Sequence, residues 1–147
     1  MNLAYVAGLM DGEGSIGFTR SRSAMVPRVS ITNTNLELLE DLKKAFGGHI
    51  SPLTRVNSRW KNAYAWVINN SRAVDFVDSI EPWLRIKKEQ AWLLFAWDAV
   101  RPGHGKRWDE EKLDVLGMLN AQSKWLNYRG VGRPEISPID AELKAVV

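Results

Sequence analysis

The 147-residue chain contains no cysteine, so it can form neither disulfide bonds nor zinc sites with thiolate ligands. Its only histidines, His49 and His104, stand alone in the sequence, and we interpret both as structural. The longest apolar run, residues 91–97, is far too short to span a membrane. The N-terminal apolar stretch lacks a basic lead and is interrupted by Asp11, so it is a poor secretory signal. These absences predict an intracellular protein without a membrane partner.

Size and composition predict one folded domain. Hydrophobic residues make up 45% of the chain and charged residues 25%, as in ordinary globular proteins, and there is no low-complexity tract. We place this domain at residues 1–128. Residues 129–147 contain two glycines and two prolines, so we expect them to form an extended, loosely packed tail.

Positive charge is segregated along the chain. Residues 14–36 and 42–74 together hold nine basic residues and no acidic residue, although the net charge of the whole chain is only +3. The remaining residues therefore carry a net charge of −6. Such separation is typical of a surface that binds nucleic acid. The alternative is an ordinary solvated surface, but random placement rarely clears acids from two windows.

The most informative stretch is residues 3–14, LAYVAGLMDGEG. Its first eight residues are apolar apart from the hydroxyl of Tyr5, which predicts a short helix buried on nearly all sides. A row of small residues at intervals of four would let a second helix approach closely. This row consists of Ala4, Gly8 and Gly12.

Two acids end this helix. The C-terminal end of a helix carries a partial negative charge, so Asp11 and Glu13 should be compensated by something cationic. We expect Gly12 and Gly14 to adopt positive φ angles, so that the chain leaves the helix abruptly and presents Glu13 at the tip. The alternative is a capped helix whose acids face water.

Hydrophobic periodicity predicts two passes of helix, strand and strand, followed by further helices. This order indicates an α+β fold with two hairpins in a four-stranded antiparallel sheet and helices on one face. Both faces of YAWVI at residues 64–68 are apolar, so either Tyr64 and Trp66 or Ala65 and Val67 could face the core. After the first helix we expect strands at 15–23 and 28–33 joined by a turn at 24–27, a helix at 36–46 capped by Asn35, strands at 49–56 and 62–70, and helices from 71 or 72 to 80, at 88–100 and from 108 or 109 to 126.

Four of the seven tryptophans bear on the choice between core and surface roles. Trp83, Trp92 and Trp97 fall in apolar helical segments, and we expect them in the core. Trp60 lies in a polar hairpin tip between Arg59 and Lys61, where contact with DNA and local packing are equally compatible with the sequence.

Residues 6–14, VAGLMDGEG, resemble the nine-residue signature of the LAGLIDADG homing endonucleases. Glu13 keeps an acid at the last acidic position of the signature. In that family two copies of this helix pack across a twofold or pseudo-twofold axis, and the last acid of each copy binds a divalent metal at the scissile phosphates. The resemblance therefore implies an αββαββα saddle over DNA, followed here by C-terminal helices, and identifies the compensating cation as a metal. The positions that agree with the signature are Ala7, Gly8, Leu9, Asp11 and Gly14.

The resemblance also implies a site chemistry. The metal ligands would be the carboxylate of Glu13 and the main-chain carbonyl of Gly12, and oxygen ligands with phosphates favour Mg²⁺, for which Mn²⁺ could substitute. A metal in this place would polarise phosphoryl oxygens and activate an attacking water. Nuclease chemistry of the ββα-metal or HNH type is not supported, because the two histidines stand alone and have no cysteine partners.

Two further catalytic residues follow from the same resemblance. The segment IEPWLRIKKEQ is similar to the family's helix start with a lysine that reaches the active site, and Lys87 is the matching residue. On residue type alone, Lys87 and Lys88 are more typical of surface charges at a helix start. Asn33 matches a polar position that orients the metal-bound water, with Thr32 and Asn35 as alternatives.

One signature and no internal repeat imply a homodimer that makes a staggered double-strand break in a long, partly palindromic DNA target, as expected of proteins encoded by mobile introns or inteins. An alternative is an RNA maturase or a non-cleaving DNA-binding regulator on the same fold. A helix-mediated interaction module that binds no nucleic acid is disfavoured by the two basic windows. The predicted dimer interface comprises Ala4, Tyr5, Gly8 and Gly12. Predicted base contacts are Thr19, Ser21, Arg28, Ser30, Thr32, Ser51 and Arg55, and predicted backbone contacts are Arg20, Arg22, Arg59 and Lys61.

Overall fold

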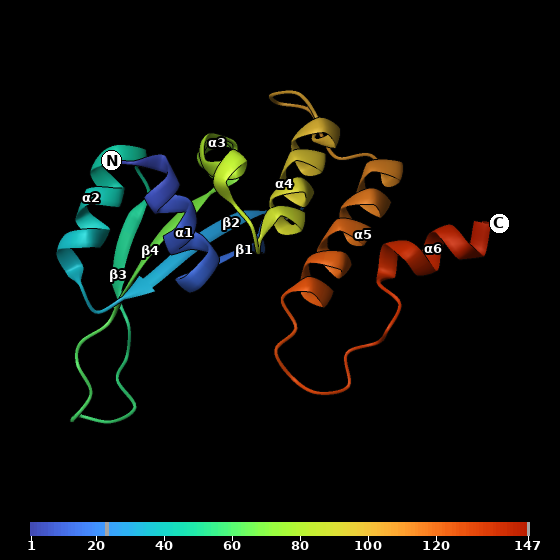
Figure 1. Ribbon diagram of the computed structural model, residues 1–147. Coiled ribbons are helices and arrows are strands. Elements are labelled where there is room, and N and C mark those ends of the chain that lie inside the picture. Colours follow the sequence, from blue (N-terminus) through green and yellow to red (C-terminus); the bar gives the residue numbers. More distant parts are fainter. Residues whose placement is uncertain (23, 147) are drawn as a thin grey trace.

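The computed structural model describes residues 1–22 and 24–146. Its element order confirms the predicted αββαββα arrangement with C-terminal helices (Figure 1). Residue 23, the last of the first predicted strand, lies outside the described residues. No helix of the described part of the chain is long and apolar enough to cross a membrane. The elements are α1 (Leu3–Glu13), β1 (Gly14–Ser21), β2 (Ala24–Asn33), α2 (Leu36–Phe46), β3 (His49–Pro52), β4 (Tyr64–Asn69), α3 (Asn70–Ile80), the 3₁₀ turn η1 (Glu81–Trp83), α4 (Lys88–Val100), α5 (Glu110–Leu126) and α6 (Pro138–Val146).

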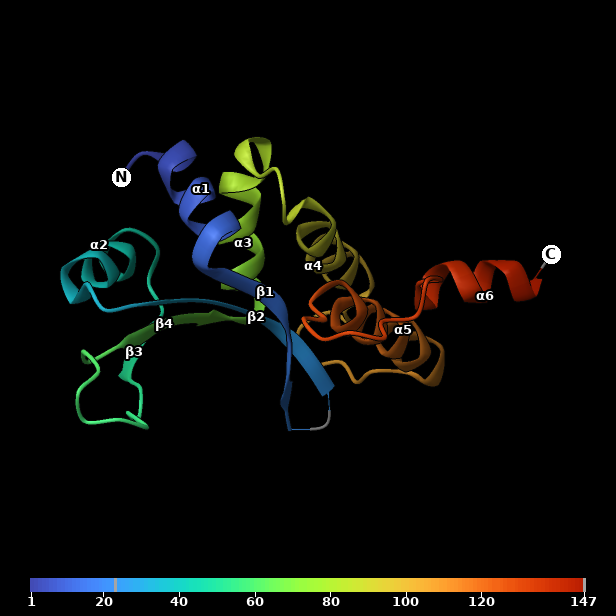
Figure 2. The same cartoon turned by 60° about the horizontal axis from the view of Figure 1, so that its bottom comes forward.

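The four strands form one antiparallel sheet in the order β1-β2-β4-β3. Helices α1, α2, α3 and α4 lie on one side of the sheet, while its ends curve away from them on the other side (Figure 2). This arrangement leaves one sheet face without a helix over its middle, between two hairpins that extend in the same direction. The predicted fold class, including the four-stranded antiparallel sheet, is therefore confirmed.

The core fills the space between the covered sheet face and the helices. Trp66 is fully buried there, and its indole N–H donates to the carbonyl of Gly47 at 2.8 Å. Tyr64 packs against the same cluster, so these two residues face the helices. Ala65 and Val67 are buried as well but do not join that cluster, because alternate residues of a strand point to opposite faces. The ambiguity in the second hairpin is thereby resolved.

Several predicted boundaries were wrong. Strand β2 begins at Ala24 rather than 28, and Pro27 lies within it opposite Phe18. Proline is accepted there because β4 pairs with β2 only from Arg28 onward, so one edge of β2 is unpaired at Pro27. Strands β3 and β4 are shorter than predicted, which leaves residues 53–63 as an irregular connection.

The predicted extended tail is partly a helix. Pro138 occupies the first position of α6, where its missing N–H is not needed. The hydroxyl of Ser137 accepts the N–H of Asp140, and Gln122 of α5 accepts the N–H of Ile139, so this helix is capped and attached to α5. We interpreted the prolines as signs of extended chain, whereas one of them starts a helix. The domain boundary after residue 128 stays a prediction.

Helix α1 differs from the prediction at its end and on its surface. It continues through Gly12 to Glu13, and neither Gly12 nor Gly14 has a positive φ angle. Gly14 is required for packing instead, since a Cβ there would overlap the sulfur of Met10 and lie 2.7 Å from the Met10 carbonyl oxygen. The helix is also not buried all round, because the row of small residues is exposed within one chain.

Candidate active site and nucleic-acid interface

Glu13 is the last residue of α1 and is exposed, with one carboxylate oxygen accepting a hydrogen bond from Asn33. Asn33 Nδ2 lies 2.6 Å from Glu13 Oε2, and Asn33 Oδ1 accepts the N–H of Asn35 at 2.8 Å. The geometry arises because β2 runs back along β1, so the end of β2 returns to the point where α1 meets the sheet. The structure thus brings together two of the three predicted catalytic residues, and the hydrogen bond to Glu13 comes from Asn33.

Asp11 serves a different purpose from Glu13. Its carboxylate accepts three main-chain N–H groups before α4, from Arg85 at 2.8 Å, Ile86 at 3.1 Å and Lys87 at 3.0 Å. The ammonium of Lys87 donates to the main-chain oxygen of Asp11 at 2.6 Å. Groups of the chain itself therefore compensate the negative charge of Asp11. The expectation that a metal compensates both acids was wrong for Asp11.

Lys87 is the predicted lysine that reaches the end of α1, whereas Lys88 lies 3.8 Å from Glu81 in an ion pair. Partial burial lowers the pKa of Lys87 below its ordinary value of 10.5. The carboxylate of Asp11 acts in the opposite direction, and the guanidinium of Arg129 adds to the lowering. Lys87 is thus a partly desolvated cation beside the end of α1.

This lowered pKa predicts a pH dependence of stability. Between the folded-state pKa of Lys87 and 10.5 the unfolded chain binds the extra proton, so stability rises with pH in that window. We expect the free energy of unfolding of the wild type, measured relative to Lys87→Met, to increase as the pH rises toward 10.5. Urea unfolding at several pH values measures this difference, and a flat or falling difference would contradict the assigned burial.

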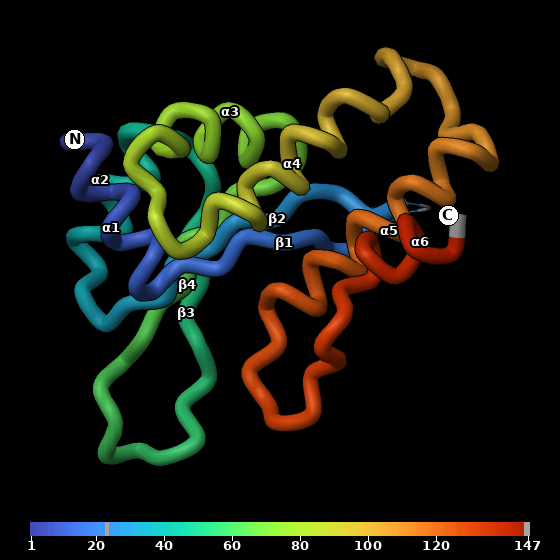
Figure 3. The backbone as a smooth tube through the Cα atoms, turned by 45° about the vertical axis from the view of Figure 1, so that its right-hand side comes forward, coloured from blue at the N-terminus to red at the C-terminus, as the bar shows by residue number. Residues whose placement is uncertain are grey.

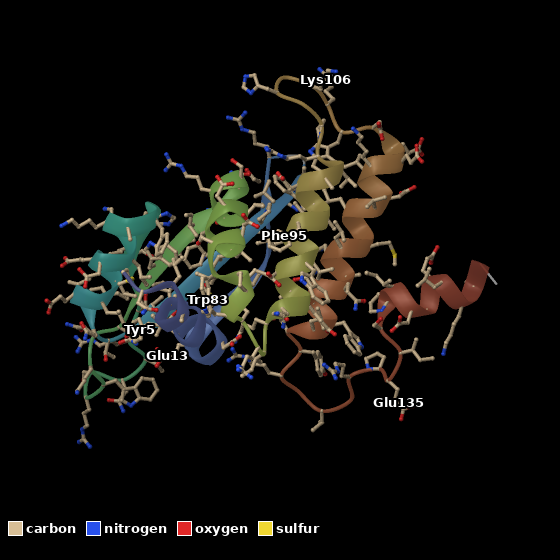
Figure 4. All side chains as sticks on the ribbon, turned by 45° about the horizontal axis from the view of Figure 1, so that its top comes forward. Tyr5, Glu13, Trp83, Phe95, Lys106 and Glu135 are labelled. Atoms are coloured by element: carbon tan, nitrogen blue, oxygen red, sulfur yellow. The ribbon has the colours of Figure 1, made fainter. Side chains whose placement is uncertain are left out.

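The predicted interface row forms an open surface on α1. Ala4, Tyr5, Gly8 and Gly12 are all exposed, and a Cβ added at Gly8 or Gly12 would meet no atom within 4 Å. Tyr5 and Trp83 lie around α1 together with Glu13 (Figure 4). Such an apolar face is unusual on a monomer surface and is typical of an interface.

Two of the tryptophans expected in the core are exposed. Trp83 is 48% exposed and Trp92 54% exposed, whereas Trp97 is buried and donates its indole N–H to the carbonyl of Met25. The expectation that Trp83 and Trp92 lie in the core, which rested on the apolar segments around them, was therefore wrong. Trp60 is also exposed, in the connection between β3 and β4.

The sheet face opposite the helices carries most of the predicted base contacts. Because paired residues in adjacent strands share a face and Ile31 and Trp66 point into the core, Ser30 and Val67 point to the open face. Arg20 has the opposite parity, since it pairs with Met25 on the helix side. By this register, the predicted residues on the open face are Thr19, Ser21, Arg28, Ser30, Thr32 and Ser51.

The remaining predicted contacts lie in connections. Arg22 adopts a φ of 53° in the β1–β2 turn, and Arg59 and Lys61 are exposed between β3 and β4. Arg55 was predicted to contact bases from a strand, which is wrong about its location. Its guanidinium instead donates to the carbonyls of Ser58 and Trp60, at 3.3 and 3.4 Å, within the irregular connection.

Sequence reasoning missed two polar residues of the open face. His49 pairs with Val67 and is exposed, so it lies on this face rather than in the structural role we expected. Asn69 pairs with Arg28, and its buried side-chain oxygen has no hydrogen-bond partner among the described residues. Strand alternation would have found both if the strand bounds had been known.

The sequence profile of the LAGLIDADG-like domain matches residues 1–81, which is more than half of the chain. The chain belongs to the LAGLIDADG family. A search of curated protein sequences finds no match. The residues matched by the profile include α1, the whole sheet and α3, but not Lys87.

Solved LAGLIDADG structures share the fold of this chain. The homing endonuclease I-CvuI in complex with the I-CreI target superposes with a TM-score of 0.70 at 18% identity, over 98% of this chain and 93% of that chain. The archaeal intron-encoded I-Vdi141I in complex with DNA gives 0.66 at 21% identity, over 90% and 88%. The match with I-SmaMI bound to cleaved DNA has a TM-score of 0.64 at 22% identity. It covers 93% of this chain but only 52% of that chain.

The residues at the end of α1 fit a metal that prefers oxygen ligands. No group of three or more His, Cys, Asp or Glu side chains occurs among the described residues, so one LAGLIDADG chain does not form a complete protein cage for a metal. Mg²⁺ typically takes only one or two carboxylates and completes its coordination with water and substrate phosphates. The exposed carboxylate of Glu13 and the carbonyl of Gly12, in the last turn where helix carbonyls lack partners farther along, suit that mode.

Proposed function

We propose that the protein is a site-specific homing endonuclease that binds double-stranded DNA as a homodimer and makes a staggered, metal-dependent double-strand break. The observation that carries this proposal is the arrangement at the end of α1. There the exposed carboxylate of Glu13 bonds Asn33, and Lys87 bonds the adjoining helix turn, beside a helix face that is open for a second copy. A purely structural helix end has no need for this combination.

Each residue would have a distinct task in the reaction. Glu13 and the Gly12 carbonyl would hold Mg²⁺ or Mn²⁺, which polarises the phosphodiester and activates water when bound. Asn33 fixes the orientation of Glu13 through the bond to Oε2 and could hold the attacking water. Lys87 brings a positive charge to a phosphate that gains negative charge during cleavage. Structures of I-CvuI with DNA were solved in the presence of 2 mM Mg and of 2 mM Ca, which supports the use of a divalent metal.

The homodimer follows from the need to cut two strands. One chain has a single Glu13 at the end of α1, whereas a twofold pair places one at each strand. The open row with Ala4, Gly8 and Gly12 would let two α1 helices approach closely. In this dimer Tyr5 would pack at the rim of the contact.

DNA would lie against the open sheet face. A two-stranded ribbon fits the major groove, so polar side chains of β1 and β2 can reach base edges there. Arg59 and Lys61 are exposed in the connection after β3, and in this arrangement they would meet phosphates outside the sheet. Two identical faces related by a twofold axis explain why the target would be long and partly palindromic. An enzyme acting on such DNA would work inside the cell.

The function can be tested with a randomised DNA library. Purified protein is incubated with supercoiled plasmids that contain random duplex inserts, with Mg²⁺, with Mn²⁺ and with EDTA, and linear products are sequenced. We expect one family of partly palindromic sites, cut only with a divalent metal and with staggered ends. Binding without cutting in any metal would favour a non-cleaving regulator, and selective binding of structured RNA would favour a maturase.

A further inference from the structure

The connection between α5 and α6 starts beside the candidate active site. Asn127, just after α5, donates from Nδ2 to the main-chain oxygen of Ile16 at 2.9 Å and accepts from the buried Gln90 at 3.4 Å. These bonds attach the end of α5 to the free edge of β1 and to α4. The residues that follow Asn127 therefore leave from a fixed point close to Gly14 and Ser15.

This connection has an internal structure that directs its basic residues. The indole N–H of Trp125 donates to the carbonyl of Pro134 at 2.8 Å, and the guanidinium of Arg133 lies 4.1 Å from the centre of the Trp125 ring. The hydroxyl of Tyr128 donates to the carbonyl of Val131 at 2.9 Å. The connection extends from the same side of the molecule as the β3–β4 connection (Figures 1 and 3). It therefore faces the side on which we propose DNA binds.

A hollow of about 350 Å³ lies between the start of this connection, the start of α4 and the residues that follow Glu13. Lys87 and Arg129 both line it, whereas no acidic side chain does. Arg129 forms no ion pair among the described residues, and its charge contributes to lowering the pKa of Lys87. The other residues that line the hollow are Gly14, Ser15, Ile86, Gln90, Leu126, Asn127 and Tyr128.

An anion that enters a hollow lined by two cations is attracted by both of them. We propose that this hollow binds a backbone phosphate of the DNA next to the cleavage site, with Arg129 and Lys87 supplying the positive charge and Ser15 a hydroxyl donor. The proposal rests on the proposed function and extends it, because it assigns a DNA contact to the segment after α5. A single basic residue such as Arg129 would then determine how tightly each half of the target is held at the break.

The test compares Arg129→Ala with Arg133→Ala in the full-length protein. Both variants remove a guanidinium from the same connection, but Arg133 is stacked on Trp125 and does not line the hollow. Affinity for duplex DNA is measured in Ca²⁺ over a range of salt concentrations. For Arg129→Ala we expect about tenfold weaker binding and a decrease of roughly 0.9 in the slope of log affinity against log salt, the loss of about one phosphate contact. For Arg133→Ala we expect a much smaller change.

Chemically neutral phosphates identify the contact itself. Duplexes of the selected target, or of any bound sequence, carry one methylphosphonate at successive positions. Wild-type protein should lose affinity when one phosphate next to the cleavage site in each half of the target is neutral, whereas the affinity of Arg129→Ala should not change at that position. Equal losses from both arginine variants, an unchanged salt slope, or no position with this pattern would overturn the inference. If sedimentation showed that the Arg129→Ala dimer dissociates in the absence of DNA, the phosphate site would also be refuted. Arg129 would then contact the second copy of the chain and not the DNA.

The two levels of proposal fail differently. Wild-type protein that cuts DNA although Arg129→Ala behaves like Arg133→Ala refutes only the phosphate site. Protein that shows the Arg129-dependent phosphate contact but cuts nothing supports the site and refutes the nuclease. Protein that binds no duplex at all refutes both.

Discussion

Glu13→Gln is expected to reduce DNA cleavage by about a thousandfold or more while leaving DNA binding intact. The substitution keeps the size of the side chain and an oxygen that can accept from Asn33 Nδ2, but it removes the negative charge that would hold the metal. Metal ions contribute several kcal/mol to the transition state of such reactions, and each ~1.4 kcal/mol corresponds to a tenfold change in rate. Affinity should be unchanged or higher, because a carboxylate next to phosphates is lost. Single-turnover cleavage and Ca²⁺-supported binding of the same duplex measure the two effects separately.

Asn33→Ala is the graded control for this prediction. It removes the 2.6 Å hydrogen bond that orients Glu13, together with the 2.8 Å bond that Asn33 accepts from the N–H of Asn35. We therefore expect a loss of about 10- to 100-fold in cleavage, as for residues that position a metal ligand. Added Mn²⁺ should restore part of the activity of Asn33→Ala and none of that of Glu13→Gln. Cleavage by Glu13→Gln at a rate near the wild-type value would refute the site assignment.

Gly8→Leu is expected to dissociate the dimer without unfolding the chain. A side chain at Gly8 would meet no atom within 4 Å in the single chain, and leucine favours a helix over glycine by about 1 kcal/mol. In the proposed dimer, each copy would instead place a leucine between two closely packed helices. Overpacking costs about 1–3 kcal/mol per site, so the dimer Kd should increase roughly 100-fold or more and double-strand cleavage should fall with it. Sedimentation measures association, and urea unfolding measures the stability of the chain.

Gly117→Leu provides a matched comparison. Gly117 also lies within a helix, α5, is exposed, and a Cβ added there would meet no atom within 4 Å. The same substitution there should raise stability by a similar amount and leave association unchanged. Two monomeric or two dimeric variants would show that the face of α1 with Gly8 is not the interface.

Local chemistry made part of the fold predictable from the sequence. Helix α2 has the predicted bounds because its ends are set by neighbours in sequence, with the side chain of Asn35 accepting the N–H of Leu38 and Gly47 adopting a φ of 83°. The prediction for the end of α1 was wrong because a glycine is required at position 14 by its contact with Met10 and not by a positive φ angle. Packing of that kind leaves no local signal.

The candidate site was predictable only in part. Periodicity alone could not join Asn33 to Glu13, which are 20 residues apart, or Lys87 to Asp11, which are 76 apart. Those associations came from the resemblance to a known signature. The three bonds that Asp11 accepts were missed because their donors are main-chain N–H groups, which every residue except proline carries. The contribution of Arg129 was missed because the chain after α5 was expected to be loosely packed.

The connection between β3 and β4 has a consequence for how such a protein changes over generations. Residues 53–63 contribute no side chain to the buried core, and Val56 at 90% and Trp60 at 59% exposure leave their surfaces to solvent. Substitutions at exposed positions away from special contacts usually change folding stability by less than about 0.5 kcal/mol. Mutations in this stretch can therefore accumulate without loss of the native state, while the strands that carry it stay in register. Under the proposed function, related proteins could therefore change their preferred DNA target through single substitutions in residues 53–63, without loss of the fold.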